Sequence, residues 1–478
     1  MYDRFRAADP AYDGRFFTGV ATTGIYCLAS CHARKAKREN VRFFPSTAAA
    51  REAGFRACQL CHPDDFARGA DPVLETIETL VGEVRADPAA FPNVRAVVRR
   101  SGFGPTRVFE LVRQHYHSTP AEVLLRARLA RIKADLVATD RPLTQLAGEA
   151  GFASLSVLHA HFRDKFGLTP AAYRGLRSAA RFTLILPTGY PLPYLRRALS
   201  RDPQSVSERW TGDVYEVAVE CPPRPKEGQT AFEPAVLRLD FSATPSVQVS
   251  LSPFGDAIRA HQLAVGLLGL EQDAAAFARF AKRLGFGRLV AGRPQLRVSQ
   301  TVSVFEGLMW AIIGQQINLP FAFALRRRLF ELVGRPIDGL FAAPTPAAVG
   351  ALTVEQLRAV QFSRQKAEYL IGAARRVADG SLDLEGLRQQ SATRAERSLL
   401  GLRGLGPWSV NYLMMRSLGY PDCLPLGDTG VTSGLKHLFQ LEERPDADAT
   451  RRLMAVFSPY RSLATSHLWQ LLQSAPEA

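Results

Sequence analysis

Four of the six cysteines in the chain lie in two close pairs near its start, and this feature limits the fold most strongly. The pairs have Cys-x3-Cys and Cys-x2-Cys spacing, and their members are Cys27, Cys31, Cys58 and Cys61. Such pairs are typical of structural zinc sites, in which four thiolates complete one tetrahedron. His32 and His62 each follow a cysteine of the set and are alternative ligands. The spacing therefore predicts a small domain that gains its folding energy from one Zn²⁺.

The charge of the chain indicates its partner. Its 60 Lys and Arg exceed its 45 Asp and Glu and give a net charge of +15. Such an excess favours a polyanion, above all nucleic acid. The start, "MYDRFRAADPAYDG", lacks the apolar region of a signal peptide, and no apolar run reaches the roughly 20 residues that span a bilayer. We therefore expect a cytoplasmic, nucleoid-associated protein, in a compartment where paired cysteines hold metal rather than form disulfides.

The residues around the cysteines, "TTGIYCLASCHARKAKREN" and "AGFRACQLCHPD", resemble the N-terminal domain of Ada-type methylphosphotriester-DNA methyltransferases. In that family the first cysteine of the four, here Cys27, is both zinc ligand and methyl acceptor. The chemistry agrees, because a metal keeps a thiolate ionised at neutral pH and the thiolate is the nucleophile. The thioether product is not readily reversed, so each molecule acts once. A purely structural zinc site is the alternative.

A basic cluster follows the first cysteine pair: Arg34, Lys35, Lys37 and Arg38. Such a cluster would hold the phosphates that flank a methylated phosphate. The alternative is a solvated charged face without a ligand.

Helical periodicity dominates from about Asp71 to Gly175. The stretch "LAGEAGFASLSVLHAHFRDKFGLTPAAYR" predicts a helix-turn-helix with Gly151 at the turn, Ser154 as the N-cap, and Leu158 and Phe162 facing the core. It resembles the second motif of AraC-type DNA-binding domains. "RSGFGPTRVFELVRQHYHSTPAEVLLRARL" resembles a degenerate first motif, with a linking helix from Pro120 to Ala138.

The resemblance places the exposed side chains of the second helix, such as Ser154 and His159, against DNA. Ala160 stands where the AraC family commonly has Arg, and the neighbouring side chains offer little bidentate contact to bases. The sequence therefore implies DNA binding more directly than recognition of a particular promoter.

A different pattern begins at Arg181. "RFTLILP", "DVYEVAVEC", "AVLRLDF" and "SVQVSLS" alternate apolar and polar residues and predict the strands of a small sheet. Helical periodicity returns from Gln262 to the end. Nothing resembles the "PCHR" motif of the second catalytic half of classical Ada proteins.

The most informative late stretch is "LLGLRGLGPWSVNYLMMRSLGYPDCLPLGDTGV". Leu402 to Gly406 predicts a Gly-x-Gly hairpin between helices, whose amides, at Gly404 and Gly406, would bind phosphate. With "IIGQQI" and "SHLWQ", it resembles AlkA-type 3-methyladenine DNA glycosylases over roughly Arg181 to Gln473. The resemblance implies that Asp428 is the catalytic carboxylate, although its position also suits a helix N-cap.

Three aromatic residues match positions of that family: Trp408, Tyr412 and Trp469. They are either core residues or the walls of a pocket for a flipped, positively charged alkylpurine. Trp408 stands where glycosylases that also cut the strand have Lys, so we expect no lyase activity. Gln315 and Gln316 align with the turn that fills the gap left by the flipped base. Two remaining cysteines cannot hold an iron–sulfur cluster.

The sequence thus predicts a multidomain α+β protein. We expect a zinc domain at 1–70, an all-α AraC-type double helix-turn-helix domain at 71–177, an α+β subdomain with an antiparallel sheet at 178–292, and an all-α helix-hairpin-helix glycosylase core at 293–478. Expected ligands are Zn²⁺, a monovalent cation at the hairpin, alkylated and promoter double-stranded DNA, and RNA polymerase. A damage-responsive transcription factor whose glycosylase-like domain only binds damage is the alternative function.

Overall fold

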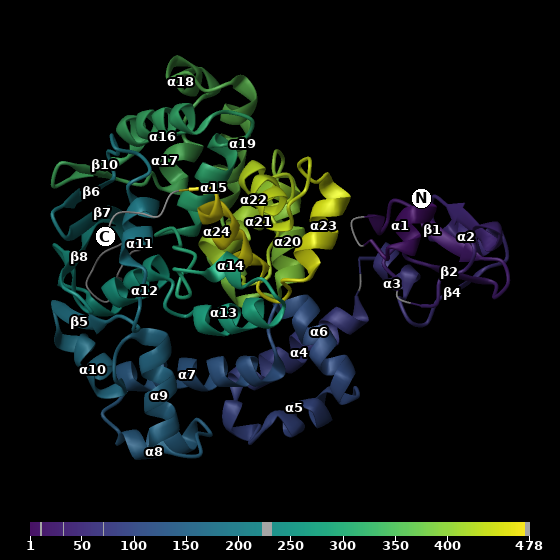
Figure 1. The fold of residues 1–478 in the computed structure, drawn as a ribbon, viewed down its shortest axis with the longest axis horizontal. Coiled ribbons are helices and arrows are strands. Elements are labelled where there is room, and N and C mark those ends of the chain that lie inside the picture. Colours follow the sequence, from purple (N-terminus) through teal and green to yellow (C-terminus); the bar gives the residue numbers. More distant parts are fainter. Residues whose placement is uncertain (10–11, 32, 70, 222–231, 474–478) are drawn as a thin grey trace. The chain divides into compact units, whose positions relative to one another are not determined.

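The computed structural model describes residues 1–9, 12–31, 33–69, 71–221 and 232–473 of the chain (Figure 1). The chain divides into two compact units, Met1–Gly82 and Glu83–Ala478. None of the helices in the described ranges is long and apolar enough to cross a membrane.

The first unit is built on a four-stranded sheet in the order β3-β1-β2-β4. Its strands are β1 Phe17–Val20, β2 Ile25–Cys27, β3 Val41–Phe44 and β4 Arg56–Ala57. The short helices are α1 Tyr2–Arg6, α2 Thr47–Glu52 and α3 Pro63–Ala67. Strand β4 runs parallel to β2, whereas the other pairs are antiparallel. The carboxyl ends of β2 and β4 therefore lie side by side.

Helix α4 (Pro72–Ala86) leads into the predicted helix-turn-helix region. The helices there are α5 Val94–Ser101, α6 Pro105–Tyr116, α7 Pro120–Ala138, α8 Leu143–Glu149, α9 Leu155–Phe166 and α10 Pro170–Gly175. Helix α7 has the predicted bounds of the linking helix, which confirms it. Ser154 caps α9 by accepting from the Val157 amide, and the Leu158 and Phe162 side chains are fully buried, also as predicted.

A five-stranded antiparallel sheet in the order β5-β9-β8-β7-β6 follows. Its strands are β5 Arg181–Ile185, β6 Glu208–Thr211, β7 Val214–Cys221, β8 Glu233–Ala243 and β9 Ser246–Ser252. Four of them are the predicted strands, and the short edge strand β6 was not predicted. Helix α11 (Leu192–Leu199) lies between β5 and β6 in the chain, and α12 (Ala257–Leu268) packs against β8 and β9.

The rest of the second unit is mainly helical, as predicted, and runs from teal through green to yellow in Figure 1. Its helices are α13 Ala274–Arg283, α14 Gly287–Val290, α15 Val304–Ile313, α16 Leu319–Val333, α17 Pro346–Gly350, α18 Val354–Ala359, α19 Arg364–Ala378, α20 Ala392–Leu400, α21 Pro407–Leu413, α22 Thr429–Phe439, α23 Ala447–Ala455 and α24 Arg461–Leu471. Strands β10 (Arg335–Ile337) and β11 (Leu340–Ala342) form an unpredicted hairpin, and α21 continues into a π-helical turn at Met414–Leu418.

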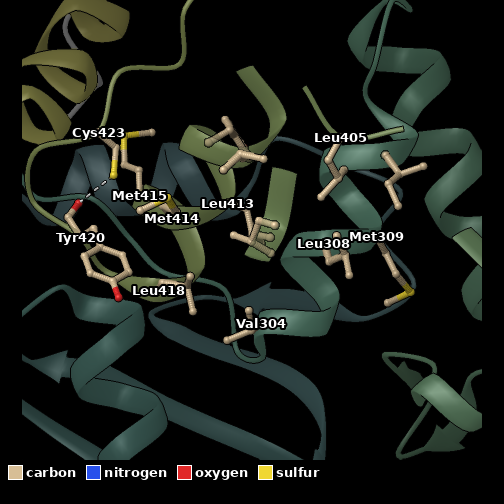
Figure 2. Packing of buried hydrophobic residues seen from close by; sticks show 14 of the residues in the cluster. Val304, Leu308, Met309, Leu405, Leu413, Met414, Met415, Leu418, Tyr420 and Cys423 are labelled. Carbon is tan, nitrogen blue, oxygen red and sulfur yellow. Dashed lines mark hydrogen bonds between the residues drawn. The ribbon is translucent and has the colours of Figure 1, made fainter. Parts of the chain in front are cut away.

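One large apolar core supports this helical region. Figure 2 shows a part of it, where Val304, Leu308 and Met309 of α15 lie near side chains of α21 and the π-helical turn. Leu405 of the Gly-x-Gly hairpin belongs to the same core and is only 7% exposed. Because the hairpin is packed into a close-packed interior, its backbone has a defined position relative to the neighbouring helices.

Two fully buried histidines make the stability of the second unit dependent on pH. Burial lowers the pKa of His261 to about 4 and that of His467 to about 3. Below pH 6.5 the unfolded chain binds protons that the folded chain cannot bind, so the free energy of unfolding falls as the pH is lowered towards 4. At pH 4 each histidine should lower the free energy of unfolding by about 3 kcal/mol. Urea unfolding at several pH values measures this loss.

The matched control for this pH dependence is His261→Gln, which does not titrate. Between pH 6.5 and 4 its free energy of unfolding should fall less steeply than that of the wild type. Parallel curves for the two proteins would show that His261 takes up its proton equally well in the folded state.

Candidate functional site

The two cysteine pairs meet at the adjacent ends of β2 and β4. In the parallel pairing, Tyr26 faces Ala57, and the Cys58 amide donates to the Tyr26 carbonyl at 3.0 Å. Cys27 follows Tyr26 in β2, and Cys58 follows Ala57 in β4. The first cysteine of each pair therefore comes directly after the same pair of facing residues. Parallel pairing of two distant segments is therefore the local cause of the cluster.

The four cysteine sulfurs lie within 4.8 Å of one another, and those of Cys31 and Cys58 are 4.0 Å apart. A tetrahedron with zinc–sulfur bonds of about 2.3 Å needs sulfur–sulfur distances of about 3.8 Å, so the cluster fits Zn²⁺. The amides of Leu28 and Leu60 point at the sulfurs of Cys61 and Cys58, each at 3.4 Å. Such donors stabilise thiolates.

The alternative histidine ligands have different positions. His62 lies outside the sulfur cluster and pairs with the Asp65 carboxylate at 3.5 Å. His32 falls outside the described residues. Cys27 is 5% exposed as a residue, whereas Cys61 is half-buried.

The four residues of the basic cluster after Cys31 differ in their exposure and in their contacts. Arg34, Lys37 and Arg38 are exposed. Lys35 instead donates to the Cys31 carbonyl and lies 4.3 Å from the centroid of the Phe5 ring. Lys35 thus supports the zinc loop, and the three exposed members remain the predicted phosphate contacts.

Helix α9 carries the predicted DNA-contacting residues of the second helix-turn-helix. Ser154 is exposed, and its hydroxyl accepts from the Val157 amide at 3.3 Å. His159 is half-buried one turn further along, while Val157 is 43% exposed. The outward-facing side chains near the N-terminus of α9 are therefore small and mostly uncharged.

The Gly-x-Gly segment connects α20 to α21 as predicted. Gly404 has a φ of 93°, and a Cβ there would lie 2.1 Å from a ring carbon of Tyr369. Only glycine suits that conformation and that contact. Gly406 is the N-cap position of α21, followed by Pro407. The loop thus ends at a helix N-terminus, where free amides can bind a phosphate.

Asp428 is the N-cap of α22 and receives three donors. Its Oδ1 accepts from the Val431 amide at 2.9 Å and from Trp469 Nε1 at 2.8 Å. Its Oδ2 accepts from Trp408 Nε1 at 3.2 Å. Asp428 therefore caps α22 and also lies beside the predicted aromatic pocket. Three hydrogen-bond donors orient its carboxylate.

The three predicted pocket residues lie together. The Tyr412 ring stacks on the Trp408 ring, with centroids 5.4 Å apart. The centroids of the Tyr412 and Trp469 rings are 6.2 Å apart. They line a cleft of about 1640 Å³ that also reaches Asp428 and both hairpin glycines. Aromatic faces beside a carboxylate suit a flat, positively charged ring.

Two pocket residues were missed in the sequence. Trp310 donates to the Tyr412 hydroxyl at 3.1 Å and packs on Phe323, so it holds the tyrosine ring in place. Gly430 allows Trp469 to approach, because a Cβ there would lie 2.6 Å from the indole ring. The sequence offered only weak signals for either, namely an aromatic residue before "AIIGQQ" and a glycine after Asp428.

The turn between α15 and α16 is held by side chains from two directions. Gln315 Nε2 donates to the Gly404 carbonyl and to Ser409 Oγ, each at 2.9 Å. Lys366 donates to the carbonyls of Ile312 and Ile313 and, at 2.7 Å, to that of Gln315. Burial lowers the pKa of Lys366 to about 8. Gln315 therefore ties the turn to the hairpin, while Gln316 is exposed with a φ of 53°.

Comparison with known families matches three regions of this architecture. Residues 1–64 match the family described as "Metal binding domain of Ada". Residues 97–175 match a "Helix-turn-helix domain", and residues 309–459 match the "HhH-GPD superfamily base excision DNA repair protein" family.

Individual relatives cover the same parts. A Mycobacterium tuberculosis protein named "Probable bifunctional transcriptional activator/DNA repair enzyme AlkA" is 29% identical over 99% of this chain and 96% of its own length. A DNA-3-methyladenine glycosylase of Bacillus subtilis is 34% identical over 37% of this chain and 60% of its own. A solved Archaeoglobus fulgidus 3-methyladenine DNA-glycosylase has a TM-score of 0.52 at 22% identity, covering 60% of this chain and 96% of that one, and so supports the fold.

The order of the matched regions agrees with the zinc-type cysteine cluster, the helix-turn-helix and the Gly-x-Gly hairpin described above. The chain therefore combines a region that matches the metal-binding domain of Ada, a region that matches a helix-turn-helix domain and a region that matches the HhH-GPD superfamily of base excision DNA repair proteins, in the same chain order.

Proposed function

We propose that this chain repairs alkylated DNA by two chemistries and binds DNA through its helix-turn-helix. It demethylates DNA methylphosphotriesters once per molecule at Cys27, and it excises alkylated bases such as 3-methyladenine by hydrolysis of the N-glycosidic bond. The observation that supports excision best is the Asp428 carboxylate, oriented by two indole N–H groups beside the stacked Trp408 and Tyr412 rings.

Methyl transfer follows from the chemistry of the cysteine cluster. Zinc, when bound by the four cysteines, keeps their sulfurs ionised. The Cys27 thiolate attacks the methyl carbon of the phosphotriester and forms a carbon–sulfur bond. The carbon–oxygen bond breaks, and the phosphate oxygen leaves with the electron pair as an ordinary diester. Arg34, Lys37 and Arg38 are exposed and serve as contacts to flanking phosphates.

Cys27→Ser should abolish methyl uptake, because a hydroxyl near neutral pH is far less nucleophilic than a thiolate. DNA carrying radiolabelled methylphosphotriesters is incubated with the protein, and the label on the protein is counted. Cys221→Ser is the control and should take up the full label. Loss of uptake in Cys61→Ser with normal uptake in Cys27→Ser would assign the acceptor to Cys61 instead.

Base excision follows from the pocket. A flipped alkylpurine stacks against the aromatic faces, which favour its positive charge. As the bond to the base lengthens, the sugar gains positive charge, which the Asp428 carboxylate stabilises, and water adds to the sugar carbon. Incubation with methylated duplex DNA tests this activity by the appearance of free alkylpurines. Because Trp408 offers no amine for a Schiff base, the abasic strand should stay uncut.

The proposal extends to partners and location. The protein binds alkylated DNA and promoter DNA, contacts RNA polymerase as an activator, and works at the nucleoid in the cytoplasm. We also propose that the domains change at about residues 70, 177 and 292. A monovalent cation at the hairpin carbonyls assists phosphate binding there, and replacing K⁺ by a large organic cation should weaken DNA binding.

A further inference from the structure

The Tyr412 side chain carries a hydroxyl hydrogen that no protein group accepts. Trp310 Nε1 donates to the Tyr412 hydroxyl at 3.1 Å. An indole N–H can only donate, so the tyrosine oxygen is the acceptor in this bond and its own hydrogen is not used there. No group in the described part of the chain accepts that hydrogen. Tyr412 is only 8% exposed, and buried tyrosine hydroxyls usually have a partner, so a ligand in the cleft is the natural acceptor.

The neighbours of Tyr412 set the direction of this hydrogen. A hydroxyl hydrogen turns to suit its partners, and the Trp310 N–H occupies one side of the oxygen, so the hydrogen points away from Trp310. Trp310 is itself held by Phe323, with ring centroids 5.0 Å apart. All three side chains line the cleft that contains Asp428, which places the hydroxyl group at the cleft.

The other polar hydrogens of the aromatic pocket are already bound. Trp408 Nε1 and Trp469 Nε1 both donate to the Asp428 carboxylate, at 3.2 and 2.8 Å. The Tyr412 ring is a neighbour of both indole rings, with centroids 5.4 and 6.2 Å away. A flipped base that stacks on either indole therefore brings its edge near the Tyr412 hydroxyl. Among these three aromatic side chains, only Tyr412 can still donate to that edge.

We infer that the Tyr412 hydroxyl donates to the C6 carbonyl oxygen of a flipped, alkylated guanine, and that this hydrogen bond makes the pocket favour alkylated guanines over alkylated adenines. Guanine carries a carbonyl acceptor at C6, whereas adenine carries an amino donor there. Enzymes read flipped bases by hydrogen bonds to this edge. The positive charge of an alkylated purine weakens its ring nitrogens as acceptors, while the exocyclic oxygen keeps its lone pairs. Tyr412 is thus a specificity-determining residue, which deepens the proposed excision activity and rests on it.

The cleft supplies a matched control. Tyr190 also lines it, but the Tyr190 hydroxyl already donates to the Leu268 carbonyl at 2.9 Å. Tyr412→Phe and Tyr190→Phe therefore remove the same atom from the same cleft, in one variant a free donor and in the other an occupied one. Tyr412→Phe keeps the aromatic ring that packs on Trp408, so the stacking surface for the base is retained.

The first measurement is the release of two kinds of base from one substrate. Duplex DNA treated with a methylating agent carries methylated guanines and methylated adenines, and chromatography separates the bases that each protein releases. Relative to wild type, Tyr412→Phe should release 7-methylguanine about three- to tenfold more slowly, which is the value of one hydrogen bond between uncharged groups. Its release of 3-methyladenine should change by less than about twofold.

The ratio of the two bases is the quantity that decides. Both bases come from the same reaction, so a loss of folded protein lowers both rates equally and leaves their ratio unchanged. Tyr190→Phe should keep the wild-type ratio. An equal loss for both bases in Tyr412→Phe, or a loss confined to 3-methyladenine, would overturn the inference.

The second measurement needs no catalysis. It uses duplex DNA with one 2′-fluorinated 7-methylguanine nucleotide, which resists excision because fluorine destabilises the sugar cation. Fluorescence anisotropy gives the dissociation constant of each protein for this duplex. Tyr412→Phe should bind it about three- to tenfold more weakly than wild type and Tyr190→Phe do. A duplex with an abasic-site analogue, which offers no C6 carbonyl, should bind equally to wild type and both variants.

The two duplexes separate base recognition from DNA binding in general. Equal weakening of Tyr412→Phe on both duplexes would make Tyr412 a general DNA contact and contradict the inference. If the wild type releases no base while the difference between the duplexes holds, the proposed excision fails and the recognition of the C6 carbonyl stands.

Discussion

Removing the metal should unfold the Met1–Gly82 unit while the second unit stays folded. Structural zinc in small domains contributes about 10–16 kcal/mol, which matches or exceeds the roughly 5–15 kcal/mol net stability of a whole domain. The sulfur cluster joins two segments that also share a small apolar core, in which Tyr26 and Leu28 belong to the same cluster as Phe55. Hydrogen exchange measured by mass spectrometry before and after treatment with a strong chelator should show loss of amide protection throughout the first unit, β1 to β4 included, and unchanged protection in the second unit.

Cys58→Ser should reproduce the chelator effect, because it leaves three thiolates for one metal. Cys423→Ser, which alters a buried thiol outside the cluster, is the control and should leave the first unit protected. Full protection in β2 and β4 after metal analysis has shown removal of zinc would mean that the apolar contacts suffice and would contradict the metal-dependent fold.

Asp428→Asn should slow alkylpurine release by roughly a hundred- to thousandfold, the loss typical of removing one preorganised electrostatic group. Asparagine caps helices as well as aspartate does, so α22 should stay intact. DNA affinity should hold or rise, because a negative charge near phosphates disappears. Single-turnover release and fluorescence anisotropy measure the rate and the affinity separately.

The structure adds a second effect to this substitution. Asp428 accepts from both indoles, and an amide nitrogen at Oδ2 would face the Trp408 N–H as a second donor. Trp408→Phe keeps an aromatic ring without that hydrogen bond and is the matched variant. It should lose roughly ten- to a hundredfold in rate, because a hydrogen bond to a charged group is worth about 1.5–3 kcal/mol. Equal losses in the two variants would assign the effect to ring position rather than charge.

The features that the sequence predicted correctly depend on local pattern. Helix α7 runs from Pro120 to Ala138 as predicted, because Thr119 and Glu122 form a capping box at its start and its buried side chains continue as far as Leu136. Strands β5, β7, β8 and β9 follow their alternation of apolar and polar residues. The cysteine spacing predicted the cluster, although not the parallel strand pairing that builds it.

The features that the sequence missed are short or non-local. Strand β6 has four residues at a sheet edge, and its charged residues Glu208 and Arg209 lie on opposite faces, so it lacks a clear alternation of apolar and polar residues. The turn of the β10–β11 hairpin is formed by Asp338 and Gly339, a pair typical of tight turns, and both have positive φ. The three-residue strands on either side are too short for a periodic signal. Lys366 lies 51 residues or more along the chain from the carbonyls that it binds, so only the tertiary fold reveals its role.

The central claim is that the protein hydrolyses the N-glycosidic bond of alkylated purines in DNA, and that it does so in the aromatic cleft beside Asp428. It is tested most directly by incubating the purified wild-type protein with methylated duplex DNA and separating the products by chromatography and denaturing gel electrophoresis. The account predicts free 3-methyladenine, together with abasic strands that break only after treatment with alkali. Tight binding of the same DNA without release of any base would contradict it and favour a damage-binding regulator.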